Sequence, residues 1–512
     1  MPRRILIPCL VAALGAAAYL LLAPPSADLA AQEYRAELGL VLWNNGWFAG
    51  HHTPGYSVLF PPLGGALGVR LTGALAAVAA AALFAELAHR HWDRGHAASL
   101  AALWFAAGTA AVLLTGRLTF LLGVAIGLAA LLALAHDRRG VAAALAAATT
   151  LASPVAGLFV ALAAVAWALG DRHERRAAGA AIALAALAPT AVMLVLFPQG
   201  GSEPFVASAF WPALAVTLVV AALLPARERV LRIGALLYAV ALVAAFGLAT
   251  PLGGNASRLG ALVAGPLLLG ALAGRRSPLS LAALALPLAY WPLYPAVRDV
   301  VRASGDPSLR AGYYEPLLRQ LDMRAQRGTF RLEIPFTENH WEARHVAGGR
   351  DGVPLARGWE RQLDRRYGAL FYDAGLDAAS YRAWLDDRAV AYVALPGVAL
   401  DDAGRAEAGL VAGGLPYLRE VWRNAHWRLF EVLRAKPLAD GAAAVLTGAG
   451  SVTLRAARPG DVLVRVHHTR WWRVTSGSAC VSAAPGGMTR VRVRTAGIVR
   501  IEARLRGASC RR

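Results

Sequence analysis

One stretch near the N-terminus concentrates the side chains that could do chemistry. Residues 33–63 read EYRAELGLVLWNNGWFAGHHTPGYSVLFPPL, with acids, histidines, tryptophans and asparagines. The chain on either side, as far as about residue 296, is mostly Ala, Leu, Val and Gly. Polar side chains beside a bilayer lose hydration, so a chain that keeps many there usually uses them. We expect this stretch to form the floor of a site that faces away from the cytoplasm.

Three carboxylates in this region are candidate general bases. Asp28, Glu33 and Glu37 follow the first apolar segment, and the two glutamates are four residues apart, on one face if the segment is helical. A carboxylate near apolar walls can take the proton of a hydroxyl group, because burial raises its pKa. We predict Glu33 as the base, with Asp28 next and Glu37 as the third catalytic candidate. The alternative is a surface amphipathic helix with solvated acids.

Further residues could hold a substrate. Arg258 follows a Gly-rich loop at a predicted helix start, where backbone N–H groups and a guanidinium can bind phosphate; Arg117 is the second such arginine. An interfacial anchor or a salt bridge is the alternative role for each. The other predicted substrate-binding residues are Asn45, Trp47, His51, His52 and Tyr56.

Each of these residues could instead have a purely structural role. The aromatic rings could face a sugar, but such rings also mark membrane interfaces. The histidines could move protons or bind a metal, but a capping or hydrogen-bonding role beside Gly50 and Pro54 is favoured. A divalent cation is therefore possible, and the cofactor stays unknown.

The composition indicates a polytopic membrane protein. Of 512 residues, 57% are hydrophobic, which is more than an ordinary soluble domain of this length carries. The formal net charge is +20, and much of the excess lies in short clusters between apolar runs. This pattern is typical of cytoplasmic loops, so we expect no nucleic-acid partner.

Roughly eleven apolar runs precede residue 297 and are predicted transmembrane helices. They lie at about 5–23, 71–88, 97–115, 118–135, 141–152, 155–170, 177–197, 207–224, 231–249, 260–273 and 278–296. The first is interpreted as a retained helix rather than a signal peptide. Because 141–152 is short and Ser153-Pro154 follows it, that run and the next are predicted to form a broken or re-entrant pair.

The distribution of arginine predicts a cytoplasmic N-terminus. With that orientation, only Arg35, Arg70, Arg117 and Arg258 lie in outer segments before residue 297. The inner segments hold Arg3, Arg4, Arg90, Arg94, Arg138, Arg139, Arg172, Arg175, Arg176, Arg227, Arg229, Arg232, Arg275 and Arg276. This bias fits a bacterial cell membrane protein whose remaining chain lies outside the cytoplasm.

After residue 296 the chain becomes more polar, which predicts three parts overall. Residues 1–296 would form the membrane domain, with a first outer loop at 25–70; 297–438 would be an extracytoplasmic α/β region. Residues 439–512 alternate with period two between Gly and Pro turns, which predicts a small antiparallel β domain. Arg490, Arg492 and Arg494 would line its solvated face.

Three further groups of residues bear on metal binding or on disulfide formation. TENHWEARH carries Glu338, His340, Glu342 and His345 without a known zinc spacing, which favours a polar surface or a substrate-facing loop. His467 and His468 are neighbours in a predicted strand and would point to opposite faces. A disulfide between Cys480 and Cys510 is plausible if the tail is extracytoplasmic.

The layout resembles the GT-C superfamily of membrane glycosyltransferases. These proteins have a large first outer loop with an acid shortly after the first helix, as at Asp28, Glu33 and Glu37. The GHHTPGYSVLFPPL loop is also similar to that of a bacterial membrane protein group related by name to 6-pyruvoyl-tetrahydropterin synthase. This loop lacks a paired acidic motif, which leaves the base and any metal open.

The resemblance implies inverting transfer of a sugar from a polyprenyl-phosphate donor to a cell-envelope acceptor on the extracytoplasmic face. The expected partners are membrane lipid, the lipid-linked sugar and an envelope glycan. Two alternatives remain: a transporter or flippase for a lipid-linked substrate, and a non-catalytic scaffold that binds envelope polymers. The sequence shows no internal repeat, which disfavours the transporter.

Overall fold

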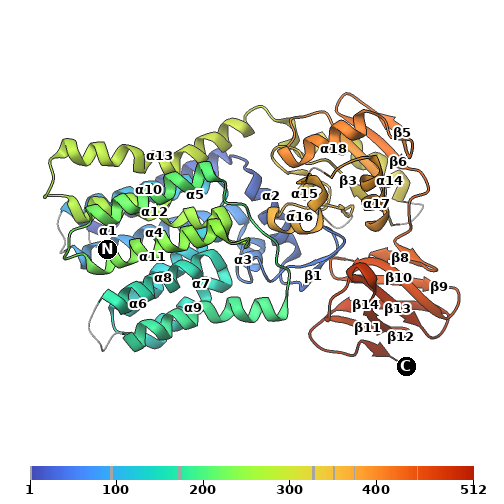
Figure 1. Cartoon of the computed structure of the whole chain (residues 1–512), viewed down its shortest axis with the longest axis horizontal. Helices are drawn as coiled ribbons and strands as arrows, with labels where there is room; N and C mark the ends of the chain where they lie inside the picture. Colours follow the sequence, from blue (N-terminus) through green and yellow to red (C-terminus); the bar gives the residue numbers. More distant parts are fainter. Residues whose placement is uncertain are drawn as a thin grey trace. The chain divides into compact units, whose positions relative to one another are not determined.

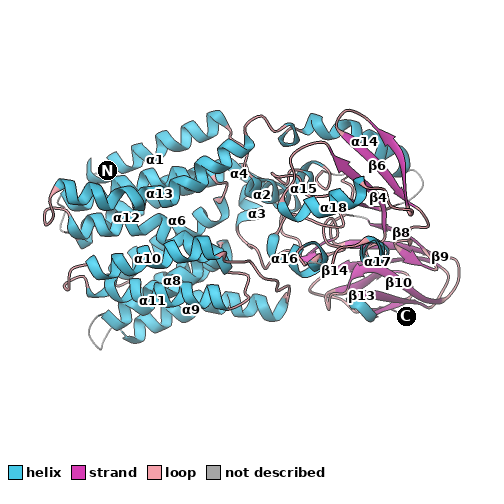
Figure 2. Ribbon diagram, turned by 45° about the horizontal axis from the view of Figure 1, so that its top comes forward, coloured by secondary structure: helices cyan, strands magenta, loops and turns pink. Residues whose placement is uncertain are grey.

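The protein divides into two compact units. The computed structural model describes residues 3–92, 96–170, 176–325, 329–349, 352–373, 375–446 and 448–511. The helical unit comprises Met1–Gln32 and Gly55–Ser304, and the mixed unit comprises Glu33–Pro54 and Gly305–Arg512. Figure 2 shows that strands belong to the mixed unit, whereas the helical unit is built of helices. Three arginines of the predicted inner segments, Arg94, Arg172 and Arg175, lie outside the described residues.

Each predicted apolar run forms a helix of the helical unit (Figure 1). These helices are α1 (Arg3–Leu22), α4 (Val69–His91), α5 (His96–Leu114), α6 (Leu118–Ala135), α7 (Arg139–Ala152), α8 (Pro154–Gly170), α9 (Arg176–Leu196), α10 (Ala207–Leu223), α11 (Arg229–Gly247), α12 (Arg258–Leu272) and α13 (Pro278–Ala303). Two shorter helices, α2 (Ala27–Leu38) and α3 (Phe60–Leu67), follow α1. The helical unit extends past residue 296 because α13 continues to Ala303.

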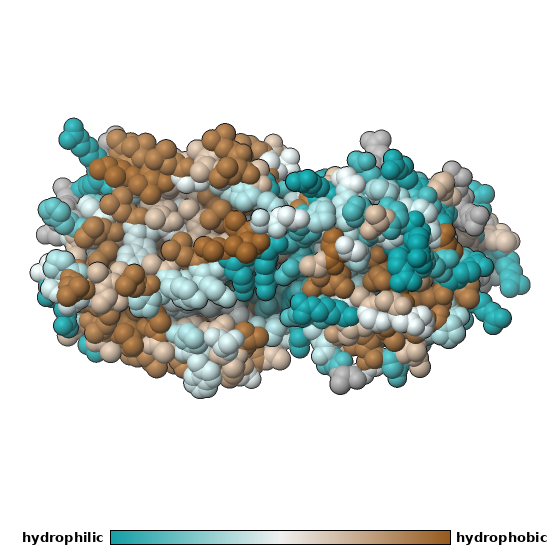
Figure 3. Space-filling view, turned by 90° about the horizontal axis from the view of Figure 1, so that it is seen from above, coloured by the Kyte–Doolittle hydropathy of each residue, from teal (hydrophilic) through white to brown (hydrophobic). Residues whose placement is uncertain are grey.

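Eight helices among the described residues are long and apolar enough to cross a membrane. They are α1, α4, α5, α6, α9, α11, the segment Gly253–Leu272 that contains α12, and α13. The apolar helices α7, α8 and α10 are shorter. Large hydrophobic side chains such as Leu184 (67% exposed) and Leu286 (73% exposed) lie on the surface of this unit, and Figure 3 shows hydrophobic residues spread over its face. Such a surface suits a lipid environment.

The break between α7 and α8 is covered by the segment that precedes α3. Ser153 is extended and ends α7. The backbone N–H groups of Val58 and Leu59 donate to the Leu151 carbonyl, and the Ser57 hydroxyl donates to the Ala152 carbonyl at 2.7 Å. The carbonyls at the end of α7 are therefore satisfied by protein, as backbone inside a membrane requires.

The first part of the mixed unit is an α/β region. Its sheet has the order β3-β4-β6-β5, with β3 parallel to β4 and the other pairs antiparallel. The strands are β3 (Arg331–Glu333), β4 (Val390–Pro396), β5 (Leu418–Arg423) and β6 (Trp427–Val432). The helices are α14 (Ala311–Ala325), α15 (Glu342–His345), α16 (Arg361–Tyr367), α17 (Ala378–Asp387) and α18 (Asp402–Ala412). Tyr381, Val393 and Phe430 pack in its core.

The last part of the chain is a β sandwich. A five-stranded sheet has the order β15-β12-β13-β10-β7, and a four-stranded sheet has the order β11-β14-β9-β8. The strands are β7 (Ala439–Asp440), β8 (Ala443–Leu446), β9 (Ser451–Ala456), β10 (Gly460–His467), β11 (Trp472–Ser476), β12 (Ala479–Ala483), β13 (Met488–Val493), β14 (Gly497–Ala503) and β15 (Cys510–Arg511). Inward valines such as Val464 and Val491 form the core. Cys480 and Cys510, opposite each other on β12 and β15, form a disulfide.

The stretch Glu33–Pro54 is built into the mixed unit. Its strands β1 (Trp43–Asn44) and β2 (His51–His52) pair with each other, and Trp43 belongs to the core of the sandwich. Backbone hydrogen bonds connect the stretch to both parts of the unit. The Asn45 N–H donates to the Ala449 carbonyl of the sandwich, and the Leu355 N–H of the α/β region donates to the Gly46 carbonyl. This stretch therefore joins the α/β region to the sandwich.

Candidate functional site

An acid and two arginines meet in the helical unit. Asp28 lies in the first turn of α2, Arg117 precedes α6, and Arg258 begins α12. The Asp28 carboxylate oxygen Oδ2 is 3.6 Å from Arg117 Nε and 4.0 Å from Arg258 Nη2. The three side chains are 37%, 30% and 20% exposed, respectively. An accessible carboxylate with two guanidinium groups can bind an anion and accept a proton.

Gln32 positions Asp28 against the start of α6. Its amide Nε2 donates to the Gly116 carbonyl, and its Oε1 accepts from both the backbone N–H and the hydroxyl of Thr119, each at 2.9 Å. Gly116 has a φ of +68°, and a Cβ there would lie 2.0 Å from the hydroxyl of Ser26. The chain therefore needs glycine at this close approach.

Arg258 is held by its helix and by an aromatic ring. Its guanidinium carbon lies 5.7 Å from the centre of the Phe120 ring, within range of a cation–π contact. The Tyr238 hydroxyl donates to the Ala256 carbonyl at 2.8 Å and accepts from the Gly260 backbone N–H at 3.1 Å. Tyr238 thereby fixes the chain on both sides of Arg258.

Other charged groups surround this cluster. Arg258 interacts electrostatically with Tyr56 and Glu203, and Asp299 on α13 interacts with both Arg117 and Asp28. Arg298 donates to the Asp299 carboxylate at 3.0 Å. The cluster thus mixes both charge signs, so an incoming anion would have to replace acidic partners of the arginines.

An apolar cavity of about 790 Å³ lies among the helices of this unit. Its wall includes Phe120, Leu259 and Gly260, next to Arg258, and continues along α6 to Ala135. Fifteen residues of α helix correspond to about 22 Å. Apolar cavities do not hold water well, and this volume is typical of ligand pockets. The cavity therefore suits a long apolar chain.

Trp92 lies at the far part of the cavity wall, with Arg90 and His91. Its ring packs against Gly270 of α12, where an added Cβ would lie 2.5 Å from a ring carbon. His91 also pairs with Glu228, at 2.7 Å between Nε2 and Oε2. Arg90 also donates to Glu86, whereas the buried indole Nε1 of Trp92 has no hydrogen-bond partner among the described residues.

Glu33 and Glu37 do not join the Asp28 cluster. Both pair with Arg344 in the mixed unit: Glu33 Oε2 is 3.8 Å from Arg344 Nε, and Glu37 contacts Arg344 Nη2. The geometry of α2 explains the separation, because residues five apart on a helix point in different directions. Of the other outer arginines, Arg35 pairs with Glu360, and Arg70 donates to the Pro24 carbonyl at 2.9 Å.

Most predicted substrate-binding residues of the first loop are structural groups of the mixed unit. Trp47 is fully buried, and its Nε1 donates to the Ala343 carbonyl at 3.3 Å. The Asn45 amide donates to the Ser451 carbonyl at 3.1 Å. His52 Nε2 lies 2.8 Å from the hydroxyl of Thr469.

Both histidines of this loop are also held neutral by burial. Desolvation lowers the pKa of His51 well below its ordinary value and lowers the pKa of His52 to about 4. Tyr56, the remaining candidate of the loop, belongs to the helical unit and interacts with Arg258.

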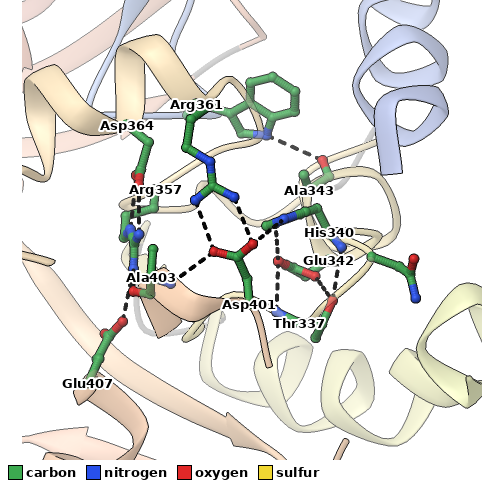
Figure 4. Close-up of polar contacts among 12 residues, drawn as sticks. Thr337, His340, Glu342, Ala343, Arg357, Arg361, Asp364, Asp401, Ala403 and Glu407 are labelled. Carbon is green, nitrogen blue, oxygen red and sulfur yellow. Dashed lines mark hydrogen bonds and ion pairs between the residues drawn. The ribbon is translucent and has the colours of Figure 1, made fainter. Parts of the chain in front are cut away.

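Most of the loop TENHWEARH is buried in the α/β region, although the sequence favoured a polar surface or a substrate-facing loop. Figure 4 shows the polar contacts of His340 and Glu342. His340 Nε2 is 3.4 Å from Asp401, and Arg361 holds Asp401 through two hydrogen bonds of 2.9 and 2.7 Å. The His340 ring stacks on Trp359 with ring centres 3.4 Å apart. Within the described residues, no group of three potential metal ligands is close enough to hold an ion.

A second buried network surrounds Arg357. Its guanidinium bonds Asp364 at 2.9 and 2.7 Å and Glu407 at 3.1 Å, and Glu333 lies 4.0 Å away. Burial raises the pKa of Glu407 to about 7, and it also raises that of Glu333. Because these groups are completely enclosed, the network stabilises the fold and offers no path to a substrate.

Sequence reasoning missed Gln32, Arg298 and Asp299. Gln32 is a lone amide in a short helix, and its role depends on Thr119, far along the chain. Arg298 and Asp299 were assigned to the start of the soluble region, since the apolar run ends at 296. The helix α13 in fact continues to Ala303, and a helical extension of that apolar run would have placed both residues in the helical unit.

No protein-family model matches the chain, and none of the characterised proteins with which its sequence was compared matches either. The function is therefore argued from the site itself.

Proposed function

We propose that the protein transfers a sugar from a polyprenyl-phosphate-linked donor to an acceptor of the cell envelope. The observation that carries the proposal is the meeting of Asp28, Arg117 and Arg258, where Arg258 contacts Phe120 in the wall of the apolar cavity. A lipid-linked donor has an apolar chain, a phosphate and a sugar, and these three elements match the cavity, the arginines and the space around the acid. We infer that eleven helices span a bacterial membrane and that the mixed unit lies outside the cytoplasm.

Asp28 is the proposed base. It takes the proton of the acceptor hydroxyl as that oxygen attacks the anomeric carbon of the donor. The bond from this carbon to the phosphate oxygen breaks, and the electron pair leaves with the lipid phosphate. The configuration at the anomeric carbon is inverted, because attack and departure occur on opposite faces.

The two arginines hold the leaving phosphate. Guanidinium groups form paired hydrogen bonds with phosphate and stabilise the negative charge that develops on it. When a phosphate occupies Arg117 and Arg258, it replaces the Asp28 carboxylate as their partner. Donor binding would thus free Asp28 for the acceptor.

The alternative function is translocation of a lipid-linked substrate. It is favoured by the length of the cavity, which follows α6 from Phe120 to Ala135. A translocator would move the lipid without breaking the bond between sugar and phosphate. Asp28 would then be a charge partner of the arginines and no proton acceptor.

The test is a profile of lipid-linked sugars and envelope glycans in a deletion strain complemented with wild type, Asp28→Asn or Glu33→Gln. For a transferase, deletion causes a polyprenyl-phosphate sugar to accumulate and a glycan to lose a residue. Wild type and Glu33→Gln restore the profile, whereas Asp28→Asn does not. An unchanged profile after deletion would refute the transferase proposal, and rescue by Asp28→Asn would refute the choice of base.

A further inference from the structure

The basic charge of the chain is concentrated at its C-terminal end. Residues 439–512 contain thirteen arginines and three acidic residues, Asp440, Asp461 and Glu502. The preceding region, 297–438, contains 21 basic and 19 acidic residues. The sandwich therefore carries about half of the net charge of the whole protein in a small domain. A field of this strength attracts polyanions.

The five-stranded sheet presents part of this charge as an ordered row. Arg490 and Arg492 alternate on β13 with Val491 and Val493, which point into the core. Arg494 continues the alternation beyond the strand. Residues two apart on a strand lie on one face, about 6.8 Å apart. Arg490 and Arg492 therefore share the outer face of the sheet, and Arg494 follows directly after the strand.

The neighbours of this row leave it accessible. Ser482 of β12 and Leu463 of β10 lie opposite Arg490, and Cys480 lies opposite Arg492. The flanking side chains on the β12 side are thus small, and they place no acid beside Arg490. β13 is an inner strand of this sheet, with β12 on one side and β10 on the other.

Only part of the row is neutralised. Arg492 forms a salt bridge with Asp461 at 2.7 Å. Within the part of the chain that the structure describes, neither Arg490 nor Arg494 forms a salt bridge. Arg490 interacts electrostatically with Asp461, and Arg494 Nη2 lies 3.3 Å from the disulfide sulfur of Cys480. Arg490 is half-buried and Arg494 is exposed, and because neither is held in a salt bridge, both guanidinium groups can bind an anion.

We propose that this face binds a linear polymer of phosphate groups. Arginine forks match phosphate oxygens, and several evenly spaced arginines favour a repeating anion over a single one. The four-stranded sheet is a poorer candidate: on its outer face Arg500 is paired with Glu502, and Arg455 lies opposite the exposed Ile498. This binding site is separate from the sugar-transfer chemistry and does not depend on it.

The test measures binding of fluorescent long-chain inorganic polyphosphate to the full-length protein in zwitterionic nanodiscs, at several salt concentrations. The probe variant is Arg490→Ser/Arg494→Ser. The matched control is Arg455→Ser/Arg458→Ser, which removes the same charge from exposed positions elsewhere in the sandwich. Unfolding temperatures of both variants check that the sandwich is intact.

The proposal predicts that wild type binds with strong salt dependence and that the probe variant loses affinity at least tenfold. In the probe variant, the slope of the logarithm of the binding constant against the logarithm of the salt concentration decreases in magnitude by about two, one for each lost phosphate contact. The control variant binds with an affinity within about threefold of wild type and with the same salt dependence. Equal losses in both variants would show diffuse attraction and overturn the assignment to this face. Binding to anionic phospholipid vesicles without polyphosphate binding would overturn it in favour of a membrane surface.

Discussion

The Asp28 carboxylate lies 3.6 Å from Arg117 Nε, and Gln32, one turn further along α2, anchors that contact to the start of α6. The pair joins the segment after α1 to a loop that is distant in sequence. Its geometry depends on the hydrogen bonds of one buried amide. This dependence makes the contact testable without changing either charged residue.

Gln32→Leu should reduce transfer by about 10- to 100-fold while it leaves both charges in place. The change removes the acceptor of Thr119 and the donor to Gly116, so the carboxylate is no longer held against Arg117. Turnover of a lipid-linked sugar in membranes measures the effect. Gln32→Glu retains the acceptor and should be less harmful than Gln32→Leu. Equal activity of Gln32→Leu and wild type would argue against a positioning role.

Arg258→Gln should weaken binding of a polyprenyl phosphate by roughly tenfold or more, because a charged hydrogen bond to phosphate is lost. Arg70→Gln is the matched control: it removes an arginine that donates to the Pro24 carbonyl and stacks on Tyr19. Ligand-induced thermal stabilisation of the purified protein reports the affinity. If both variants lose stabilisation equally, Arg258 is not a specific phosphate ligand.

Ala163→Trp should prevent binding of the lipid chain. Ala163 lines the cavity on α8, and an indole ring there occupies the space assigned to the chain. Leu184→Trp is the control, since Leu184 is 67% exposed on the surface of α9. Co-purified lipid can be quantified by mass spectrometry in both variants. Retention of polyprenyl lipid by Ala163→Trp would exclude the cavity as its site.

The sequence was sufficient to predict the helical part because long apolar runs have few alternatives to a helix. The expectation of long apolar helices followed by a C-terminal β region is confirmed. The alternation of Val with Arg on β13 likewise identified a half-buried strand. In both cases the pattern lies within one element.

The site could be predicted only in part, because its assembly depends on contacts between distant segments. Asp28, Arg117 and Arg258 were all candidates, but the sequence analysis preferred Glu33 to Asp28 as the base. The structure brings the first three together and pairs Glu33 with Arg344 instead. The predicted stretch 33–63 is divided between the two units, since Glu33–Pro54 belongs to the mixed unit and the residues from Gly55 onward belong to the helical unit.

Trp43→Ala should destabilise the mixed unit by about 3 to 5 kcal/mol, the usual cost of removing a large buried ring. Trp43 is 1% exposed, and its ring lies 5.7 Å from that of Trp472. Limited proteolysis of the full-length protein should cut the variant faster within 305–512. Trp211→Ala, at a position 60% exposed, should leave the pattern unchanged. Unaltered proteolysis of Trp43→Ala would mean that the first loop does not support the sandwich.

Acidification should destabilise the mixed unit through its buried histidines. Burial lowers the pKa of His52 to about 4 and that of His467 to about 3, whereas an unfolded histidine titrates near 6.5. The unfolded chain therefore binds more protons below pH 6.5, and stability falls as the pH decreases. Each such histidine lowers the free energy of unfolding by about 1 kcal/mol as the pH falls from 6.5 to 5.5.

The unfolding temperature of the full-length protein, measured from pH 7.5 to 4.5, checks this expectation. Glu342 acts in the opposite direction: burial raises its pKa to about 8, so its contribution weakens as the pH rises from 4.5 toward 8. His467→Gln removes one titrating group and should flatten the acid side of the curve relative to wild type. Because Glu342 opposes the histidines over this range, the comparison of the two proteins decides the question: if His467→Gln and wild type give the same curve below pH 6.5, His467 does not contribute to the acid destabilisation.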